Sequence, residues 1–324
     1  MFGVNNPENV IITGNATHAL NIAIRSLVRP GSRVIISGYE HNAVTRTLHA
    51  IPDVIVTVVD SPLFQPDKAL EGFARAVSHG ADTVICNHVS NVFGFVLPIQ
   101  EISQICHRQG IPLIIDASQS AGVLPVRMDE WSATFIAMPG HKGLYGPQGT
   151  GLLLSGTEKV QPILFGGTGS GSRLQNMPDS LPDRLEAGTH NMPGIAGLLE
   201  GIRFVKGKGI STIRQHEQKL TTLAVRRLRQ IQGVHVFATD DPSAQTGVLS
   251  FVAEGRDCEE LGTILGQRGI AVRSGLQCAP LAHQTVDTLK TGTVRVSFSA
   301  FNTAAQVDRF AVILQQILRE NVTL

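Results

Sequence analysis

Short runs of apolar residues recur through the first half of the chain, separated by segments long enough for helices. The runs are almost continuously apolar instead of alternating with polar residues, which is typical of parallel strands buried on both faces of a sheet. We therefore predict an α/β domain with a mainly parallel sheet, whose ligand lies beyond the strand ends. The seven predicted strands are 10–13, 33–37, 54–59, 83–86, 112–115, 134–137 and 151–154.

The pattern changes in the last third of the chain, where long helical stretches accompany a few short strand-like runs. Such a mixture predicts a small α+β domain. The helical stretches are 212–232 and 306–319, and the strand-like runs are 234–237, 247–252 and 293–297. We predict a large domain of residues 1–198 and a small C-terminal domain of residues 199–324, linked by a helix that starts near Gly194 and runs toward Val205.

The composition is that of a chain with a large core. Its 324 residues are 42% hydrophobic and 16% charged, enough for two domains or for one large domain with an appendage. The formal net charge is only +1 and no basic run occurs, which argues against nucleic acid or an anionic membrane as a partner. The eleven histidines lack the spacing of a metal site.

The N-terminus and the cysteines bear on the cellular compartment. Residues 1–9 lack the charged and apolar regions of a signal peptide, and no apolar run reaches the length of a membrane span. The four cysteines, which show no CxxC pairing, are Cys86, Cys106, Cys258 and Cys278. We expect a cytoplasmic protein with free thiols.

The stretch 136–151 carries the first candidate chemistry. An apolar run stops at Pro139-Gly140, presents His141-Lys142 and passes through glycines into the next apolar run. Glycine lets the backbone approach a ligand closely, and a partly desolvated lysine can lose its proton and attack an aldehyde. Lys142 is thus a candidate Schiff-base lysine, with a solvated surface lysine as the general alternative.

A carboxylate at the end of a buried strand favours the interpretation of Lys142 as a Schiff-base lysine. The run 111–115 ends in Asp116, and Gln119 follows three residues later. An isolated buried charge is very costly, so Asp116 implies a cationic partner. In enzymes that use pyridoxal phosphate (PLP), that partner is the pyridinium nitrogen, which an Asp keeps protonated so that the ring can act as an electron sink.

At this point the chain resembles the class V aminotransferase and cysteine desulfurase family of fold-type I PLP enzymes. In particular, it resembles the group of cysteine desulfurase family proteins with a GHKGLxGPQGTG motif. The matching segments follow the family's order and run nearly from end to end. They are 15–21, 40–44, 90–94, 116–119, 140–142, 186–191, 273–280 and 295–298.

The resemblance implies a set of cofactor-binding residues. They are Ala16, Thr17, His41, Asn91, Asp116, Gln119, His141, Lys142 and Thr189. In the family pattern Lys142 forms the Schiff base and removes the substrate's Cα proton. Asp116 keeps the ring nitrogen protonated, while Gln119 hydrogen-bonds the ring hydroxyl oxygen. His41 stacks on the ring and assists proton transfer, and Asn91 lies near the ring hydroxyl and the substrate.

The cofactor's phosphate is expected at the start of the first helix, predicted over 18–27. Thr17 can cap this helix, and the free N–H groups and the helix dipole then favour an anion. An ordinary N-cap is the alternative, but the resemblance makes this segment the phosphate cradle, with help from His141. Residues 165–191 read as a long flexible loop by composition. By resemblance, Thr189 reaches the phosphate of the neighbouring subunit, which implies a homodimer.

A cysteine loop distinguishes desulfurase chemistry from plain transamination. Most free cysteines are buried and inert, but Cys278 lies in a loop bounded by Gly and Pro, with Arg273 nearby. The matching family loop reads RSGxxCA, which implies that Cys278 takes the sulfur of PLP-bound cysteine and becomes a persulfide. Arg295 is costly to bury unpaired and suits bidentate binding of a carboxylate, with a surface salt bridge as the alternative. By resemblance Arg295 binds the substrate's α-carboxylate, and Arg273 is a second substrate-binding candidate.

The chain departs from the family pattern at three places. Family members usually begin with a further segment that carries a motif like LDNAAT, so this chain is predicted to be N-terminally short. Leu276-Gln277 stands where relatives commonly carry histidine, which bears on proton transfer and substrate preference. Pro139 stands where many relatives place a serine or threonine that binds phosphate, and proline offers neither hydroxyl nor N–H.

The leading interpretation is a PLP-dependent cysteine desulfurase-like lyase. It would convert L-cysteine to L-alanine and carry the sulfur as a persulfide on Cys278, for delivery to a sulfur-acceptor protein. A second interpretation is another reaction on the same cofactor, such as transamination, selenocysteine lysis or racemisation. A third is a truncated PLP fold without catalysis, motivated by the short N-terminus and Pro139.

Overall fold

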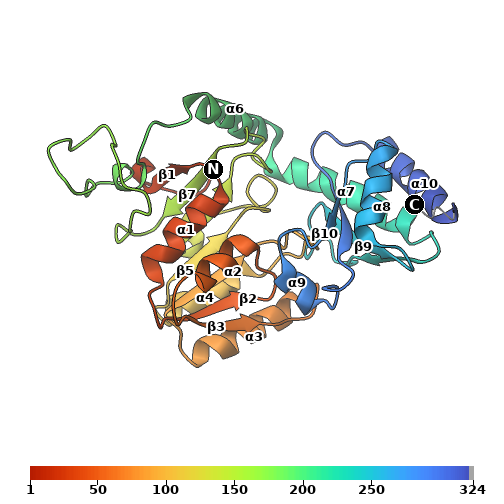
Figure 1. Ribbon diagram of the computed structural model, residues 1–324, viewed down its shortest axis with the longest axis horizontal. Coiled ribbons are helices and arrows are strands. Elements are labelled where there is room, and N and C mark those ends of the chain that lie inside the picture. Colours follow the sequence, from red (N-terminus) through yellow and green to blue (C-terminus); the bar gives the residue numbers. More distant parts are fainter. Residues whose placement is uncertain (321–324) are drawn as a thin grey trace.

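Two β-sheets organise the protein (Figure 1). The computed structural model describes residues 1–320. The larger sheet contains β1 (Val10–Thr13), β2 (Arg33–Ser37), β3 (Ile55–Val59), β4 (Thr83–Asn87), β5 (Leu113–Asp116), β6 (Phe135–Pro139) and β7 (Gly151–Ser155). The smaller sheet contains β8 (Val234–Phe237), β9 (Val248–Ala253), β10 (Arg273–Gly275) and β11 (Thr293–Ser297).

The larger sheet has the strand order β1-β7-β6-β5-β4-β2-β3. From β6 to β3 every neighbouring pair is parallel, whereas β7 is antiparallel to both β6 and β1. The mainly parallel seven-stranded sheet is therefore confirmed. Because β1, β2, β4, β5 and β6 all point the same way, the segments that follow them meet at one edge of the sheet.

Helices cover both faces of the larger sheet. The helices of the protein are α1 (Ala16–Leu27), α2 (Asn42–His49), α3 (Pro66–Ser78), α4 (Ile99–Arg108), α5 (Met128–Trp131), α6 (Met192–Lys208), α7 (Ile210–Leu228), α8 (Cys258–Gln267), α9 (Pro280–Thr285) and α10 (Ala304–Arg319). Along β4, Val84 joins a buried cluster with Phe73 of α3, while Ile85 joins the opposite cluster with Leu20 of α1. This double burial explains why the strands read as continuous apolar runs.

Strand β3 is the exception among the predicted strands. It lies at the edge of the sheet, where Ile55 is 59%, Val56 40% and Val58 39% exposed. The run is as apolar as its neighbours, so the sequence pattern predicts a strand correctly but gives no sign that this one is uncovered.

The smaller sheet packs against α7, α8 and α10 around a third buried cluster that includes Leu220, Leu261 and Phe310. The three predicted strand-like runs are confirmed as β8, β9 and β11. Strand β10 was not predicted, because its three residues, Arg-Ser-Gly, carry no apolar pattern. The proposed division between residues 198 and 199 falls within α6 and stays a prediction.

An aromatic cluster lies at the junction between the two halves of the chain. Tyr145, which follows the lysine loop, packs edge-on against Phe204 of α6 and Phe301, with ring centroids 5.1 and 5.5 Å away. The Tyr145 hydroxyl also accepts a 3.0 Å hydrogen bond from the Ala300 N–H, just before α10. In Figure 1, α6 and α7 run from the larger sheet to the smaller one. Within residues 1–320, no helix has the length and apolarity needed to cross a bilayer.

Matched isoleucines on one sheet test the account of burial. Ile85→Ala should lower the free energy of unfolding by about 2–5 kcal/mol, because it leaves a cavity between two fully packed layers. Ile55→Ala should change it by about 0.5 kcal/mol or less, because that side chain is mostly exposed. Urea unfolding measures both, and equal losses would contradict the assignment of β3 as an uncovered edge.

Candidate functional site

A cavity of about 210 Å³ lies at the carboxyl ends of the parallel strands. Loops after β1, β2, β4, β5 and β6 line it, as the topology of the sheet requires. Eight of the nine cofactor-binding residues predicted from the sequence lie on its wall. They are Ala16, Thr17, His41, Asn91, Asp116, Gln119, His141 and Lys142.

Asp116 is the last residue of β5, and Lys142 follows the adjacent parallel strand β6. Asp116 is 5% exposed, and its Oδ1 accepts a 2.8 Å hydrogen bond from the Ser118 N–H. Lys142 faces open cavity space, yet the protein atoms around its ammonium displace water and lower its pKa. The Asp116 charge opposes this shift, and the Arg295 charge adds to it. A larger share of neutral amine is thus available at Lys142 than at a surface lysine.

His41 is the N-cap of α2, and its Nδ1 accepts a 3.0 Å hydrogen bond from the Ala43 N–H. Burial lowers its pKa, the Asp116 charge opposes that shift, and the Lys142 charge contributes to it. With Nδ1 accepting, the neutral ring carries its proton on Nε2. His41 therefore presents a neutral imidazole to the cavity at neutral pH.

The start of α1 differs from the prediction in one respect. Thr17 was expected to cap the helix, but Asn15 does so, with its Oδ1 accepting from the His18 N–H at 2.9 Å. Asparagine is among the preferred capping residues, and its position before Ala16 puts Thr17 in the second helical position. The first N–H groups of a helix have no acceptor within it, so Ala16 and Thr17 still offer an anion site on the cavity wall.

A second cavity, of about 530 Å³, adjoins the first and shares Ser118, Gln119, His141 and Lys142 with it. Arg295 on β11 lines this second cavity. One guanidinium nitrogen of Arg295 donates to the Asn91 carbonyl at 2.7 Å, whereas its buried Nε has no hydrogen-bond partner among the described residues. Burial and the neighbouring Arg273 lower its pKa. No carboxylate of residues 1–320 forms an ion pair with Arg295, so it is free to bind an anionic ligand.

Arg273 does not line either cavity. Arg273 is exposed and lies directly opposite Arg295 where β10 pairs with β11. At this position Arg273 can add positive charge near Arg295, but the structure does not bring it onto the cavity wall.

Cys278 lies on an unusual turn that is fastened to the first cavity. Gln277 and Cys278 both have left-handed backbones, with φ of 43° and 57°, a conformation that costs a non-glycine residue roughly 1–2 kcal/mol. The Gln277 carbonyl accepts from Asn91 Nδ2 at 2.8 Å, and the Cys278 carbonyl accepts from the Asn42 N–H at 2.8 Å. The thiol of Cys278 is exposed and lines neither cavity, but its backbone is held by neighbours of the predicted cofactor site.

The side chain of Gln277 points away from the cavities and into a buried network. Its Oε1 accepts from His283 Nε2 at 2.9 Å, and its Nε2 donates to the Thr293 carbonyl at 2.8 Å. His283 also contacts Thr288 Oγ1 at 2.8 Å. Gln277 therefore supports the turn that carries Cys278. The sequence comparison with the family loop singled out this position but could not give its orientation.

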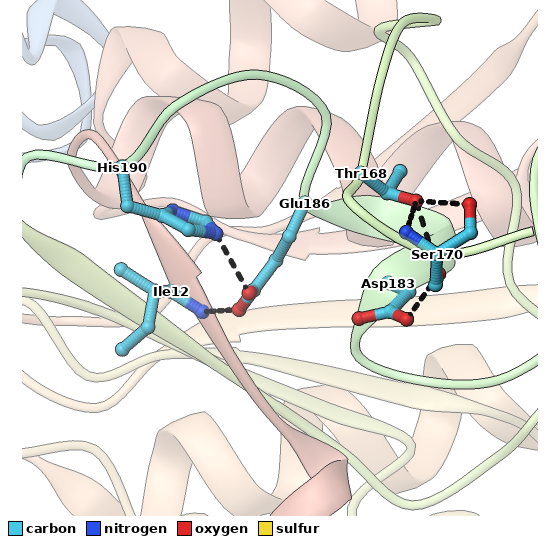
Figure 2. Close-up of polar contacts among 6 residues, drawn as sticks. All are labelled: Ile12, Thr168, Ser170, Asp183, Glu186 and His190. Carbon is cyan, nitrogen blue, oxygen red and sulfur yellow. Dashed lines mark hydrogen bonds and ion pairs between the residues drawn. The ribbon is translucent and has the colours of Figure 1, made fainter. Parts of the chain in front are cut away.

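Thr189 is the predicted cofactor residue that the structure leaves outside the first cavity. It is exposed, on the long segment between β7 and α6 that extends from the body of the protein in Figure 1. Figure 2 shows how this segment is fastened: Glu186 accepts from the Ile12 N–H at 2.6 Å and pairs with His190 at 3.0 Å. Earlier in the segment, Ser170 hydrogen-bonds Asp183 at 2.5 Å. Thr189 thus lies between Glu186, which is tied to β1, and His190, which pairs with Glu186.

Sequence reasoning missed two buried glutamates beside the cavities. Glu217 is 4% exposed and lines the second cavity, and burial raises its pKa to about 8. The sequence pattern could have revealed Glu217 as a buried acid, because it lies on the apolar stripe of α7, four residues after Ile213 and three before Leu220. Glu40, directly before the cavity residue His41, is 0% exposed, and the sequence pattern assigned it no role.

The geometry agrees with comparisons to known proteins. The sequence model of the Aminotransferase class-V family matches residues 1–310. The chain belongs to the class-V aminotransferase family. The predicted family is therefore confirmed, and so is the fold-type I architecture, since solved members have the same arrangement.

Two solved structures cover nearly all of the chain. An apo cysteine desulfurase from Thermococcus onnurineus NA1 has a TM-score of 0.86 and 27% identity over 96% of this chain and 80% of its own. The cysteine desulfurase CsdA (S-sulfonic acid) from Escherichia coli has a TM-score of 0.86 and 25% identity over 98% of this chain and 81% of its own.

Curated relatives give the same picture. A probable cysteine desulfurase from Methanothermobacter thermautotrophicus is 32% identical over 96% of this chain and 79% of the relative. One from Halalkalibacterium halodurans is 30% identical over 95% of this chain and 77% of the relative. One from Mycolicibacterium paratuberculosis is 31% identical over 97% of this chain, which spans only 47% of that longer relative.

A pair of substitutions tests the corrected cap of α1. Asn15→Ala should lower the free energy of unfolding by about 0.5–2 kcal/mol, because the His18 N–H loses its acceptor. Thr17→Ala should leave it within about 0.5 kcal/mol, since Thr17 is an exposed residue inside the helix. Thermal or urea unfolding of both variants measures these changes. A larger loss of stability for Thr17→Ala would indicate that Thr17 caps the helix, as the sequence predicted.

Proposed function

We propose that this chain is a PLP-dependent cysteine desulfurase that converts L-cysteine to L-alanine and carries the sulfur as a persulfide on Cys278. The observation that carries the proposal is the junction of the two cavities at Lys142. One cavity has Asp116 and the start of α1 on its wall, and the other has Arg295, which forms no ion pair within residues 1–320. The curated relatives and solved structures named above as cysteine desulfurases support the same choice.

The first cavity fits PLP by the chemistry of its walls. Bound PLP supplies an electron sink that stabilises negative charge at the substrate's Cα. Asp116 offers its carboxylate to a protonated ring nitrogen, and the N–H groups of Ala16 and Thr17 offer an anion site for the phosphate. The buried Oδ1 of Asn91 has no hydrogen-bond partner among the described residues, which leaves it to a ligand.

The remaining cavity residues complete the proposed cofactor site. His41 contributes a neutral ring beside the cofactor, Gln119 an amide for the ring hydroxyl, and His141 a further contact for the phosphate. Pro139 lines the cavity without a hydroxyl or N–H to give, so the helix start and His141 carry the phosphate on this side. Lys142 is placed to hold the cofactor and to move the proton of the substrate's Cα, since its lowered pKa favours the neutral amine.

The substrate is proposed to bind through the second cavity. Arg295 binds the α-carboxylate of the amino acid, with added positive charge from Arg273 behind it. The Cys278 thiolate attacks the substrate's sulfur, forming an S–S bond as the Cβ–S bond breaks. The products are a persulfide on Cys278 and, after protonation, alanine. A sulfur-acceptor protein would remove the persulfide from the exposed turn.

We further propose a cytoplasmic homodimer in which Thr189 reaches the phosphate in the neighbouring subunit's cavity. Its exposure and its absence from the cavity of its own chain support this. The anchoring of the loop through Glu186 supports a defined position for Thr189 rather than a free tail.

A first test separates the catalytic proposal from a fold that does not bind the cofactor. With added PLP, the protein should show the visible absorption of lysine-bound PLP, and L-cysteine should change it. Lys142→Ala should lose this absorption, because no other lysine of residues 1–320 lines the first cavity. Absence of the band in the unaltered protein would favour the alternative of a PLP fold without catalysis.

The cysteine loop is tested separately. Cys278→Ala should lower sulfide release from L-cysteine by roughly 10²-fold or more while retaining PLP absorption, because the nucleophile is lost but the cavity wall is not. Cys258→Ala is the matched control, since that thiol is buried in the smaller domain's core. Retained turnover in Cys278→Ala would instead favour transamination, racemisation or selenocysteine lysis, which product analysis with a keto acid and L-selenocysteine distinguishes.

A further inference from the structure

Glu40 lies in the turn between β2 and α2, directly before His41, and is 0% exposed. Its Oε1 lies 2.7 Å from Ser37 Oγ and accepts a 2.7 Å hydrogen bond from the Asn87 N–H. Its Oε2 is buried without a hydrogen-bond partner among the described residues. A buried carboxylate with one bare oxygen is very costly, whereas the same group as a neutral acid is far less so.

The protons around Ser37 can be counted. Ser37 Oγ lies 2.7 Å from Glu40 Oε1 and 2.6 Å from Asn87 Oδ1, and it accepts from the Tyr39 N–H at 3.2 Å. A hydroxyl has one proton to donate, yet both neighbours are acceptors if Glu40 is ionised. One of these two short contacts would then join two bare oxygens.

Reversing the Asn87 amide does not resolve the conflict. Asn87 Nδ2 donates to the Tyr39 carbonyl at 2.9 Å, so the reversed amide would set its oxygen against that carbonyl. Each short contact has one donor and one acceptor when Glu40 Oε1 carries a proton. Glu40 then donates to Ser37 Oγ, and Ser37 Oγ donates to Asn87 Oδ1.

We propose that Glu40 is a positioning residue that holds a proton at neutral pH and ties the turn carrying His41 to the end of β4. On the wall of the first cavity Asp116 is the only carboxylate among the described residues, and a neutral Glu40 adds no second negative charge near it. Asn87 and His41 both line that cavity, and Asn87 pairs in register with Asp116. The identity of the bound cofactor rests on the proposed function, but the protonation of Glu40 does not.

The electrostatic surroundings agree with a neutral Glu40. Burial raises its pKa to about 8; the Ser37 hydrogen bond opposes this, and the Asp116 charge adds to it. The other titratable group that Glu40 influences is Cys86 of β4, whose thiol pKa burial and the Glu40 charge both raise. Among the described residues, no Lys, Arg or His charge contributes to the Glu40 shift.

The direct test is infrared spectroscopy of the cofactor-free protein. The unaltered protein should show protonated carboxyl groups at pH 7, and Glu40→Gln should remove one of them. Glu217 is a second buried acid with a raised pKa, so Glu217→Gln should remove a different signal and leave that of Glu40. If Glu40→Gln does not fold, the Glu217→Gln background alone decides. Absence of any protonated carboxyl in that background at pH 7 would overturn the proposal.

Stability against pH gives an independent readout. The folded-state pKa lies above the unfolded value of 4.5, so the folded protein binds the extra proton and loses stability as pH rises from about 4.5 to 8. Relative to Glu40→Gln, the unfolding constant should rise by up to tenfold per pH unit in that window, or about 1.36 kcal/mol. A difference between the two proteins that does not vary with pH would contradict a proton held on Glu40.

The positioning role is measured through the ligand. The amide of Glu40→Gln can accept from Asn87 and Ser37, but Asn87 Oδ1 then loses its donor. The turn loosens, the His41 ring resonances should shift, and the dissociation constant for PLP should rise about tenfold. Glu71→Gln is the matched control, since Glu71 is exposed and paired only with Lys68. Unchanged His41 resonances and affinity would refute the positioning role, whereas no PLP binding by the unaltered protein would refute the proposed function instead.

Discussion

The parallel pairing of β5 and β6 is the constraint on which the site depends, because it brings Asp116 and the lysine loop to one edge of the sheet. Lys142 is exposed toward the cavities, nearby protein atoms lower its pKa, and the charge of Asp116 at the end of the neighbouring strand opposes that shift. Asp116 is 5% exposed, and a buried carboxylate without a cationic partner is costly. Their relative position follows from the register of β5 and β6, so the chemistry of the cavity is set by the hydrogen bonding of the sheet.

The fold was predictable because its determinants are local and repetitive. The apolar runs that became β4, β5 and β6 are buried on both faces, and this leaves a strong pattern in the sequence. The alternation of strand and helix then fixes which loops meet, which is why eight of nine cofactor-site candidates share one cavity. The exposure of β3 and the existence of β10 were not predicted. Neither exposure at a sheet edge nor a strand of three residues changes the periodic pattern of apolar residues.

Features that depend on contacts between distant segments could not be predicted. Asn15 and Thr17 are both competent caps, and only the backbone at the start of α1 selects between them. The inward turn of the Gln277 side chain depends on His283 and Thr293, which sequence alone does not place beside it. Glu40 gains its character from the Ser37 hydroxyl, which lies 2.7 Å from Glu40 Oε1 and 2.6 Å from Asn87 Oδ1, and sequence does not show such distances.

The distribution of thiols has a practical consequence. Cys86, Cys106 and Cys258 are buried, and burial raises the pKa of each, so they are slow to form the thiolate that reagents attack. Cys278 alone is exposed, on a backbone turn pinned by Asn91 and Asn42. A maleimide dye or spin label would therefore attach at one defined point of the native protein without removal of other cysteines, and would report on the approach of a partner to that turn.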